Sequence, residues 1–144
     1  MSHPFTVVFL IAVALATVTR LWLAARHIRY VEQHRDVVPT EFAGQITGES
    51  HARAADYTCT KTRFGMVSTL VEAAVLLAFT LGGGLDWIDR LAGGWFGQPL
   101  ARGLALVALV MVIAALADLP LGIYRTFVIE ARFGFNKMTP GLYA

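Results

Sequence analysis

Three long apolar stretches, separated by polar segments, dominate the pattern along the chain. They run from about residue 4 to 25, from 65 to 85 and from 103 to 124, and each contains one charged residue. A helix needs about 20 mostly apolar residues to cross a bilayer. No stretch alternates with the period of two that is typical of a strand. The pattern therefore predicts an all-α membrane protein with three transmembrane helices.

The segment between the first two apolar stretches is charged but still helical in pattern. No glycine or proline occurs from Phe5 to Val38, so we expect the first helix to pass beyond the membrane and to end before Pro39. Ser50 is placed to cap a second helix that leads into the second span. Cys59, the only cysteine, falls on the small-residue face of that helix and is expected in its core. We expect a helical hairpin that projects from the membrane.

The connection between the second and third spans begins with the glycine run 82–84, which we expect to end the second helix. The following segment, residues 86–91, is expected to form a short turn at the membrane interface. Trp87 within it and Trp95 after it suit an aromatic belt.

Composition and charge agree with a membrane protein. Apolar residues make up 56% of the chain and charged residues 15%, against about 25% charged in soluble domains. The net charge of +2 is too small to indicate a nucleic-acid partner. Nine Lys and Arg residues lie in the first joint and the tail, against two between the second and third spans. This predicts a cytoplasmic joint and tail, with the N-terminus outside. Because the first basic residue is Arg20, we expect an uncleaved first span, not a signal peptide.

The single charges within the three spans, Arg20, Glu72 and Asp118, are predicted to form an intramembrane polar layer. Counted from the basic residues at the cytoplasmic boundaries, Arg26, Arg63 and Arg125, they lie six, nine and seven residues inside, at depths of about 9, 13 and 10 Å. Because an isolated charge at such depth is costly, we expect Arg20 to pair with Asp118, Glu72 or both. The alternative is that Arg20 reaches the headgroups alone while each acid is protonated.

The sequence contains no recognisable catalytic or metal-binding set. A zinc protease uses two histidines one helical turn apart beside a glutamate. The nearest arrangement here is His27 and His34, seven residues apart, or about 10 Å along a helix. We therefore expect no catalytic residue, metal ligand or cofactor in this chain.

The end of the chain carries the most specific motif, Glu130-x-x-Phe133-Gly134-Phe135-Asn136-x-x-Thr139. Together with the stretches 34–35, 38–39, 54–58 and 81–84, it resembles the N-terminal membrane domain of CAAX prenyl protease 1-type zinc metalloproteases. The motif residues would form a wall or gate of a peptide path; the alternative is a structural corner that packs the third span onto later helices.

The resemblance implies that the full-length protein encloses a multi-span intramembrane chamber with zinc. It would cleave peptide bonds, typically removing the last three residues of prenylated CAAX proteins. This chain lacks HExxH, so we expect an N-terminal part that is inactive alone. Its partners would be the lipid bilayer, the remaining helices and zinc domain, and a peptide or prenylated substrate, in a bacterial inner membrane. The rival interpretation is a small non-catalytic three-span scaffold, assembly subunit or transporter subunit.

Overall fold

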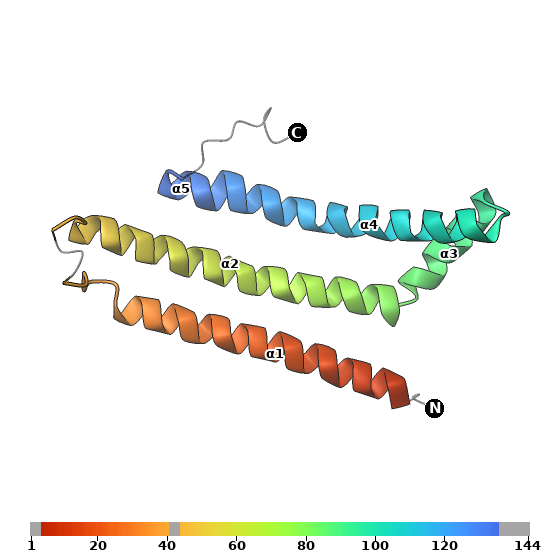
Figure 1. Cartoon of the computed structure of the whole chain (residues 1–144), viewed down its shortest axis with the longest axis horizontal. Helices are drawn as coiled ribbons and strands as arrows, with labels where there is room; N and C mark the ends of the chain where they lie inside the picture. Colours follow the sequence, from red (N-terminus) through yellow and green to blue (C-terminus); the bar gives the residue numbers. More distant parts are fainter. Residues whose placement is uncertain (1–3, 41–43, 136–144) are drawn as a thin grey trace. The chain divides into compact units, whose positions relative to one another are not determined.

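The computed structural model describes residues 4–40 and 44–135, and the regular structure in these ranges is entirely helical (Figure 1). The elements are α1 (Pro4–Gln33), α2 (Gly48–Thr80), α3 (Gly84–Trp95), α4 (Pro99–Tyr124), the π-helix η1 (Arg125–Glu130) and α5 (Ala131–Phe133). Three helical segments, Pro4–Gln33, Gly48–Thr80 and Pro99–Phe133, are long and apolar enough to cross a membrane. The all-α class and the three candidate spans are therefore confirmed.

The first helix is shorter than predicted, since α1 ends at Gln33 and not near Val38. The backbone N–H of His34 donates to the carbonyls of both Tyr30 and Val31, each at 3.2 Å. This sharing tightens the last turn towards 3₁₀ geometry. A His34 ring nitrogen lies 2.8 Å from the Tyr30 carbonyl, and the next side chain, Arg35, bonds across to α2. Contacts with a helix distant in sequence thus end α1 before Pro39 does.

The second helix is a single element that joins the predicted polar helix to the second span. Its N-terminus is capped by Thr47, whose Oγ1 accepts the N–H of Ser50 at 3.2 Å, so the cap predicted at Ser50 is wrong. At the other end α2 stops at Thr80, two residues before the glycine run that was predicted to end it. The glycine run does interrupt the chain, because Gly83 takes a left-handed φ of 74°, which costs glycine little.

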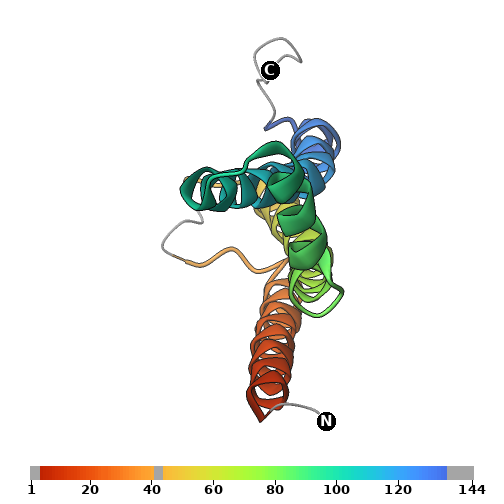
Figure 2. The same ribbon diagram turned by 90° about the vertical axis from the view of Figure 1, so that its right-hand side faces the viewer.

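The connection from α2 to α4 contains a helix where a short turn was predicted. α3 has 12 residues and turns away from the end of α2 towards the start of α4 (Figures 1 and 2). Ile88 and Ala92, one helical turn apart, are 1% and 0% exposed. Burial of this narrow apolar face stabilises the helix. The burial of these two residues depends on packing within the folded protein, which the local sequence pattern does not specify. The prediction of a short turn was therefore wrong.

The helix of the third span continues without interruption past Tyr124, the predicted end of the apolar stretch. α4 passes through Pro120 without a break, and η1 follows directly, with Thr126 and Ile129 buried. A π-helix has wider turns than an α-helix, so the register of everything after it changes. α5 then ends at Gly134.

The chain divides into two compact units, residues 1–70 with 124–144, and residues 71–123. The first contains α1, the polar half of α2, and η1 with α5. The second contains the apolar end of α2, α3 and α4. Within the first unit, Phe64 of α2 stacks on Tyr124 with ring centroids 5.1 Å apart, which ties the two chain segments together.

Candidate functional site

The motif at the end of the described chain forms a tight corner. The N–H of Gly134 donates to the Ala131 carbonyl at 3.1 Å, and the N–H of Phe135 donates to the Glu130 carbonyl at 2.9 Å. Gly134 takes a φ of 77°, the conformation common after a helix C-terminus. The backbone therefore reverses between the two phenylalanines, and Glu130 contributes through its carbonyl.

Both aromatic side chains of this corner contact one tyrosine of α2. The Tyr57 ring centroid lies 5.4 Å from that of Phe133 and 4.7 Å from that of Phe135. Lys61 Nζ lies 5.6 Å from the same tyrosine ring. The corner thus packs on the polar half of α2. Whether the motif forms the wall or gate of a peptide path, or a corner that packs the third span onto later helices, stays a prediction. Asn136 and Thr139 lie outside the described residues.

The polar ends of α1 and α2 pack together through paired charges. Arg35 donates to both carboxylate oxygens of Asp56, at 2.8 and 2.9 Å, and Arg63 donates to Glu32 at 2.5 Å. The pKa of Arg35 is raised well above its usual range, first by its hydrogen bond with Asp56 and then by that residue's charge. The guanidinium therefore stays charged at any physiological pH. These pairs join the end of α1 to the polar half of α2 in a two-helix hairpin.

The hairpin has a small apolar core behind its ion pairs. Ile28, Ala55 and Cys59 are 9%, 8% and 7% exposed. The Cys59 thiol lies 3.9 Å from the Ile28 carbonyl. The prediction that Cys59 is a core residue is confirmed, and its small neighbours allow the two helices to approach closely.

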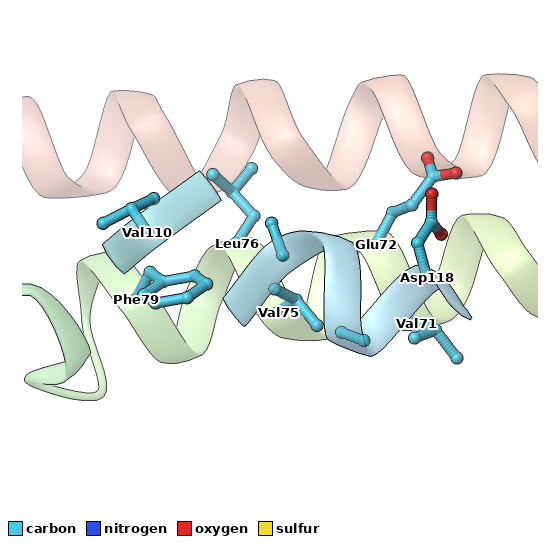
Figure 3. A pocket seen from close by; sticks show the side chains of 9 residues that line it. Val71, Glu72, Val75, Leu76, Phe79, Val110 and Asp118 are labelled. Atoms are coloured by element: carbon cyan, nitrogen blue, oxygen red, sulfur yellow. The ribbon is translucent and has the colours of Figure 1, made fainter. Parts of the chain in front are cut away.

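The two acids of the predicted polar layer lie in one groove of the second unit. This groove, about 320 Å³ in volume, runs between α2 and α4, and both carboxylates lie at the same end of it (Figure 3). Its other lining residues are apolar: Val71, Val75, Leu76, Phe79, Val110, Ala114 and Ala117. Glu72 and Asp118 thus line the same groove. The polar layer that joins them to Arg20, a residue of α1, stays a prediction.

The comparison with known families shows to which family the chain belongs. The family described as "CAAX prenyl protease N-terminal, five membrane helices" matches residues 27–144. The chain belongs to this family. The described ranges contain three helices long and apolar enough to span a membrane, against the five in the family description.

Three curated relatives of this chain share the name CAAX prenyl protease 1 homolog. The CAAX prenyl protease 1 homolog of Oryza sativa is 30% identical over 127 residues, covering 78% of this chain and 29% of the relative. That of Caenorhabditis elegans is 31% identical over 133 residues, covering 90% and 29%. That of Homo sapiens is 29% identical over 135 residues, covering 85% and 28%. The chain thus spans less than a third of the length of these relatives.

The metal-binding side chains among the described residues of this chain do not form a zinc site. Within residues 4–40 and 44–135, no three His, Cys, Asp or Glu side chains gather closely enough to hold a metal. His51 approaches His34 through a ring nitrogen that lies 3.1 Å from the His34 backbone carbonyl, a contact that links α2 to the end of α1. No step of zinc chemistry is therefore assigned to these residues.

Sequence reasoning missed the partners of the family motif. Tyr57 and Asp56 lie within the 54–58 stretch that supports the resemblance, but sequence alone assigns them no contact. The aromatic residue in an otherwise polar helical segment was the available signal for Tyr57. Nothing local marked Asp56 as the partner of Arg35, 21 residues away.

Proposed function

We propose that this chain forms part of the wall of the intramembrane chamber of a CAAX prenyl protease-like zinc metalloendopeptidase. The family match over residues 27–144 is the observation that carries the proposal. The relatives' shared name supports a prenylated CAAX protein or a related peptide as the substrate class.

In this proposal the chain is not catalytic by itself. Its described residues offer no group of metal ligands, so the zinc and the water-activating glutamate would come from the remaining domain. The described residues contribute by holding parts of the wall in position. The corner at 130–135 holds the end of the third span against Tyr57, and the paired hairpin stiffens that support.

The test compares the protein encoded by the complete natural reading frame with a polypeptide of residues 1–144. Both are expressed in membranes and incubated with a farnesylated CAAX peptide. We expect the complete protein to release the last three residues in a reaction that a zinc chelator stops, and the shorter polypeptide to release none. A stable product of the complete frame that neither cleaves the peptide nor contains an HExxH helix would favour the three-span scaffold or transporter subunit.

We further propose an orientation with the N-terminus outside and the hairpin and tail in the cytoplasm. The nine-to-two distribution of Lys and Arg supports it. Placement in a bacterial inner membrane is a prediction; the relatives reported above are eukaryotic.

Cysteine labelling tests this orientation in a Cys59→Ser background. Single cysteines at Ser50 and Gly97 lie on opposite sides of the second span. We expect a membrane-impermeant maleimide to label Gly97→Cys from outside intact cells and Ser50→Cys after the cells are opened. The reverse pattern would contradict the orientation.

A further inference from the structure

A polar groove of about 350 Å³ lies within the first unit, among α1, the polar half of α2 and α5. Its charged lining consists of four arginines and two acids: Arg35, Arg53, Arg63, Arg132, Glu32 and Asp56. The lining therefore carries two more positive than negative charges. Such an excess on a concave surface attracts an anion.

Both acids of the groove are already neutralised by arginines. Asp56 accepts both of its hydrogen bonds from Arg35, and Glu32 pairs with Arg63. The other two guanidiniums, Arg53 and Arg132, make no ion pair within the part of the chain that the structure describes. The excess charge is therefore located on these two side chains.

The two arginines come from different elements that are fixed to each other. Arg53 is on α2 and Arg132 is on α5, and the Tyr57–Phe133 contact joins the two helices. Arg53 Nη2 lies 3.8 Å from the position that a Cβ on Gly134 would occupy. Its guanidinium is therefore beside the turn that follows Arg132. Two guanidiniums on one groove suit a phosphate, whose oxygens accept several charge-assisted hydrogen bonds.

The position of the groove along the helices places it at a membrane surface. Arg63 precedes the apolar part of α2 by two residues, or about 3 Å. Arg132 follows Tyr124 by eight residues, a rise of at most about 12 Å because six of them form the π-helix η1. The headgroup layer is about 5–8 Å thick on each side of the hydrocarbon. The groove thus begins within the headgroup layer and opens beyond it. Basic pockets between membrane helices at this level are typical sites for anionic headgroups.

We propose that this groove binds the phosphate of an anionic lipid headgroup, with Arg53 and Arg132 as its ligands. The favoured lipid carries an exposed phosphate, because a choline group covers the phosphate of phosphatidylcholine with a positive charge. The site does not depend on catalysis by the rest of the protein.

Mass spectrometry of intact protein–lipid complexes tests the proposal on the complete protein in detergent. The probes are dioleoyl phosphatidic acid and dioleoyl phosphatidylcholine. We expect phosphatidic acid to bind about tenfold more tightly, and the Arg53→Gln/Arg132→Gln variant to lose about tenfold in that affinity. The matched variant Arg29→Gln/Arg125→Gln removes two exposed arginines that do not line the groove. We expect its affinity to stay within about twofold of the natural protein.

Two further measurements test the role of the positive charges and distinguish a lipid from a soluble phosphate. Arg53→Lys/Arg132→Lys retains both charges and is expected to keep a preference for phosphatidic acid, which answers the question if the glutamine variant does not fold. Soluble glycerol 3-phosphate is expected not to displace the bound lipid. Equal losses in the two glutamine variants, no preference between the lipids, or full displacement by glycerol 3-phosphate would each overturn the lipid assignment.

Discussion

At the residue scale, Gly134 determines how the family motif turns. Its φ of 77° lies in the left-handed region, where a side chain costs about 1–2 kcal/mol. Space is not limiting, since a Cβ would meet only Arg53 Nη2, at 3.8 Å. The glycine is therefore needed for its backbone freedom. Phe133 before it and Phe135 after it both contact Tyr57.

We expect Gly134→Ala to lower the free energy of unfolding by about 1 kcal/mol, because alanine strains the left-handed backbone. Thermal unfolding in detergent measures the effect. Gly65→Ala is the matched control. Gly65 lies inside α2 with open space around its Cβ position, so alanine there should not destabilise. Equal destabilisation in the two variants would contradict the argument.

At the element scale, pairing between helices decides where helices begin and end. α3 exists because its Ile88–Ala92 face is buried, and an ion pair links it to the start of α4. Arg102 donates from Nε to Asp89 Oδ1 at 2.8 Å, and its Nη2 donates to the other oxygen. Both side chains are close to half exposed, at 44% and 40%, so water screens the pair and its contribution is small.

This pair predicts a specific pH dependence. Hydrogen bonds from Arg102, aided by its charge, lower the pKa of Asp89 below the ordinary value of 3.8. Because the pKa of Asp89 is lower in the folded state than in the unfolded state, its ionised form stabilises the fold at pH values above the ordinary pKa. This stabilisation is lost as the pH falls through the folded-state pKa. We expect Asp89→Asn to lower the unfolding midpoint slightly at pH 7, and the difference to vanish as the solution is acidified below pH 3.8.

Double-mutant measurements provide the control for this pH dependence. Arg102→Gln should cause the same loss at pH 7, and Asp89→Asn/Arg102→Gln should cause little more than either change alone. Additive losses in the double variant would show that the two side chains do not act as a pair.

At the scale of the whole molecule, the charged residues within the spans need polar partners, which other helices can supply. Glu72 and Asp118 lie together at one end of an otherwise apolar groove. Two carboxylates in a membrane need a cation, a proton or further polar partners. Arg20 has the matching depth, counted along the sequence from the end of its own span.

We predict that Arg20→Leu lowers the stability of the protein in detergent by about 3 kcal/mol, because loss of the cation leaves an acid within the apolar layer without its partner. The loss should be much smaller when Glu72→Gln and Asp118→Asn are already present. Thermal unfolding of the natural protein and these three variants measures the coupling. An Arg20→Leu protein as stable as the natural one would favour the alternative, in which Arg20 reaches the headgroups alone.

The sequence by itself determined the helical class, the three candidate spans and the interruption at the glycine run. These features depend on local composition, because about 20 consecutive apolar residues suffice to define a span and a run of glycines weakens any helix. The terminal motif likewise identified the family, since it requires no knowledge of contacts. It also marked Phe133, Gly134 and Phe135 as a unit before their positions were known.

Only the tertiary structure decided the features that depend on residues distant in sequence. The early end of α1 follows the Arg35–Asp56 pairing across the hairpin, and α3 follows the burial of Ile88 and Ala92. The register change at η1 precedes the contact of the motif with Tyr57. Local propensity is a weak preference that packing and charge pairing readily override. The partners in these contacts come from separate helices, and folding alone brings them together.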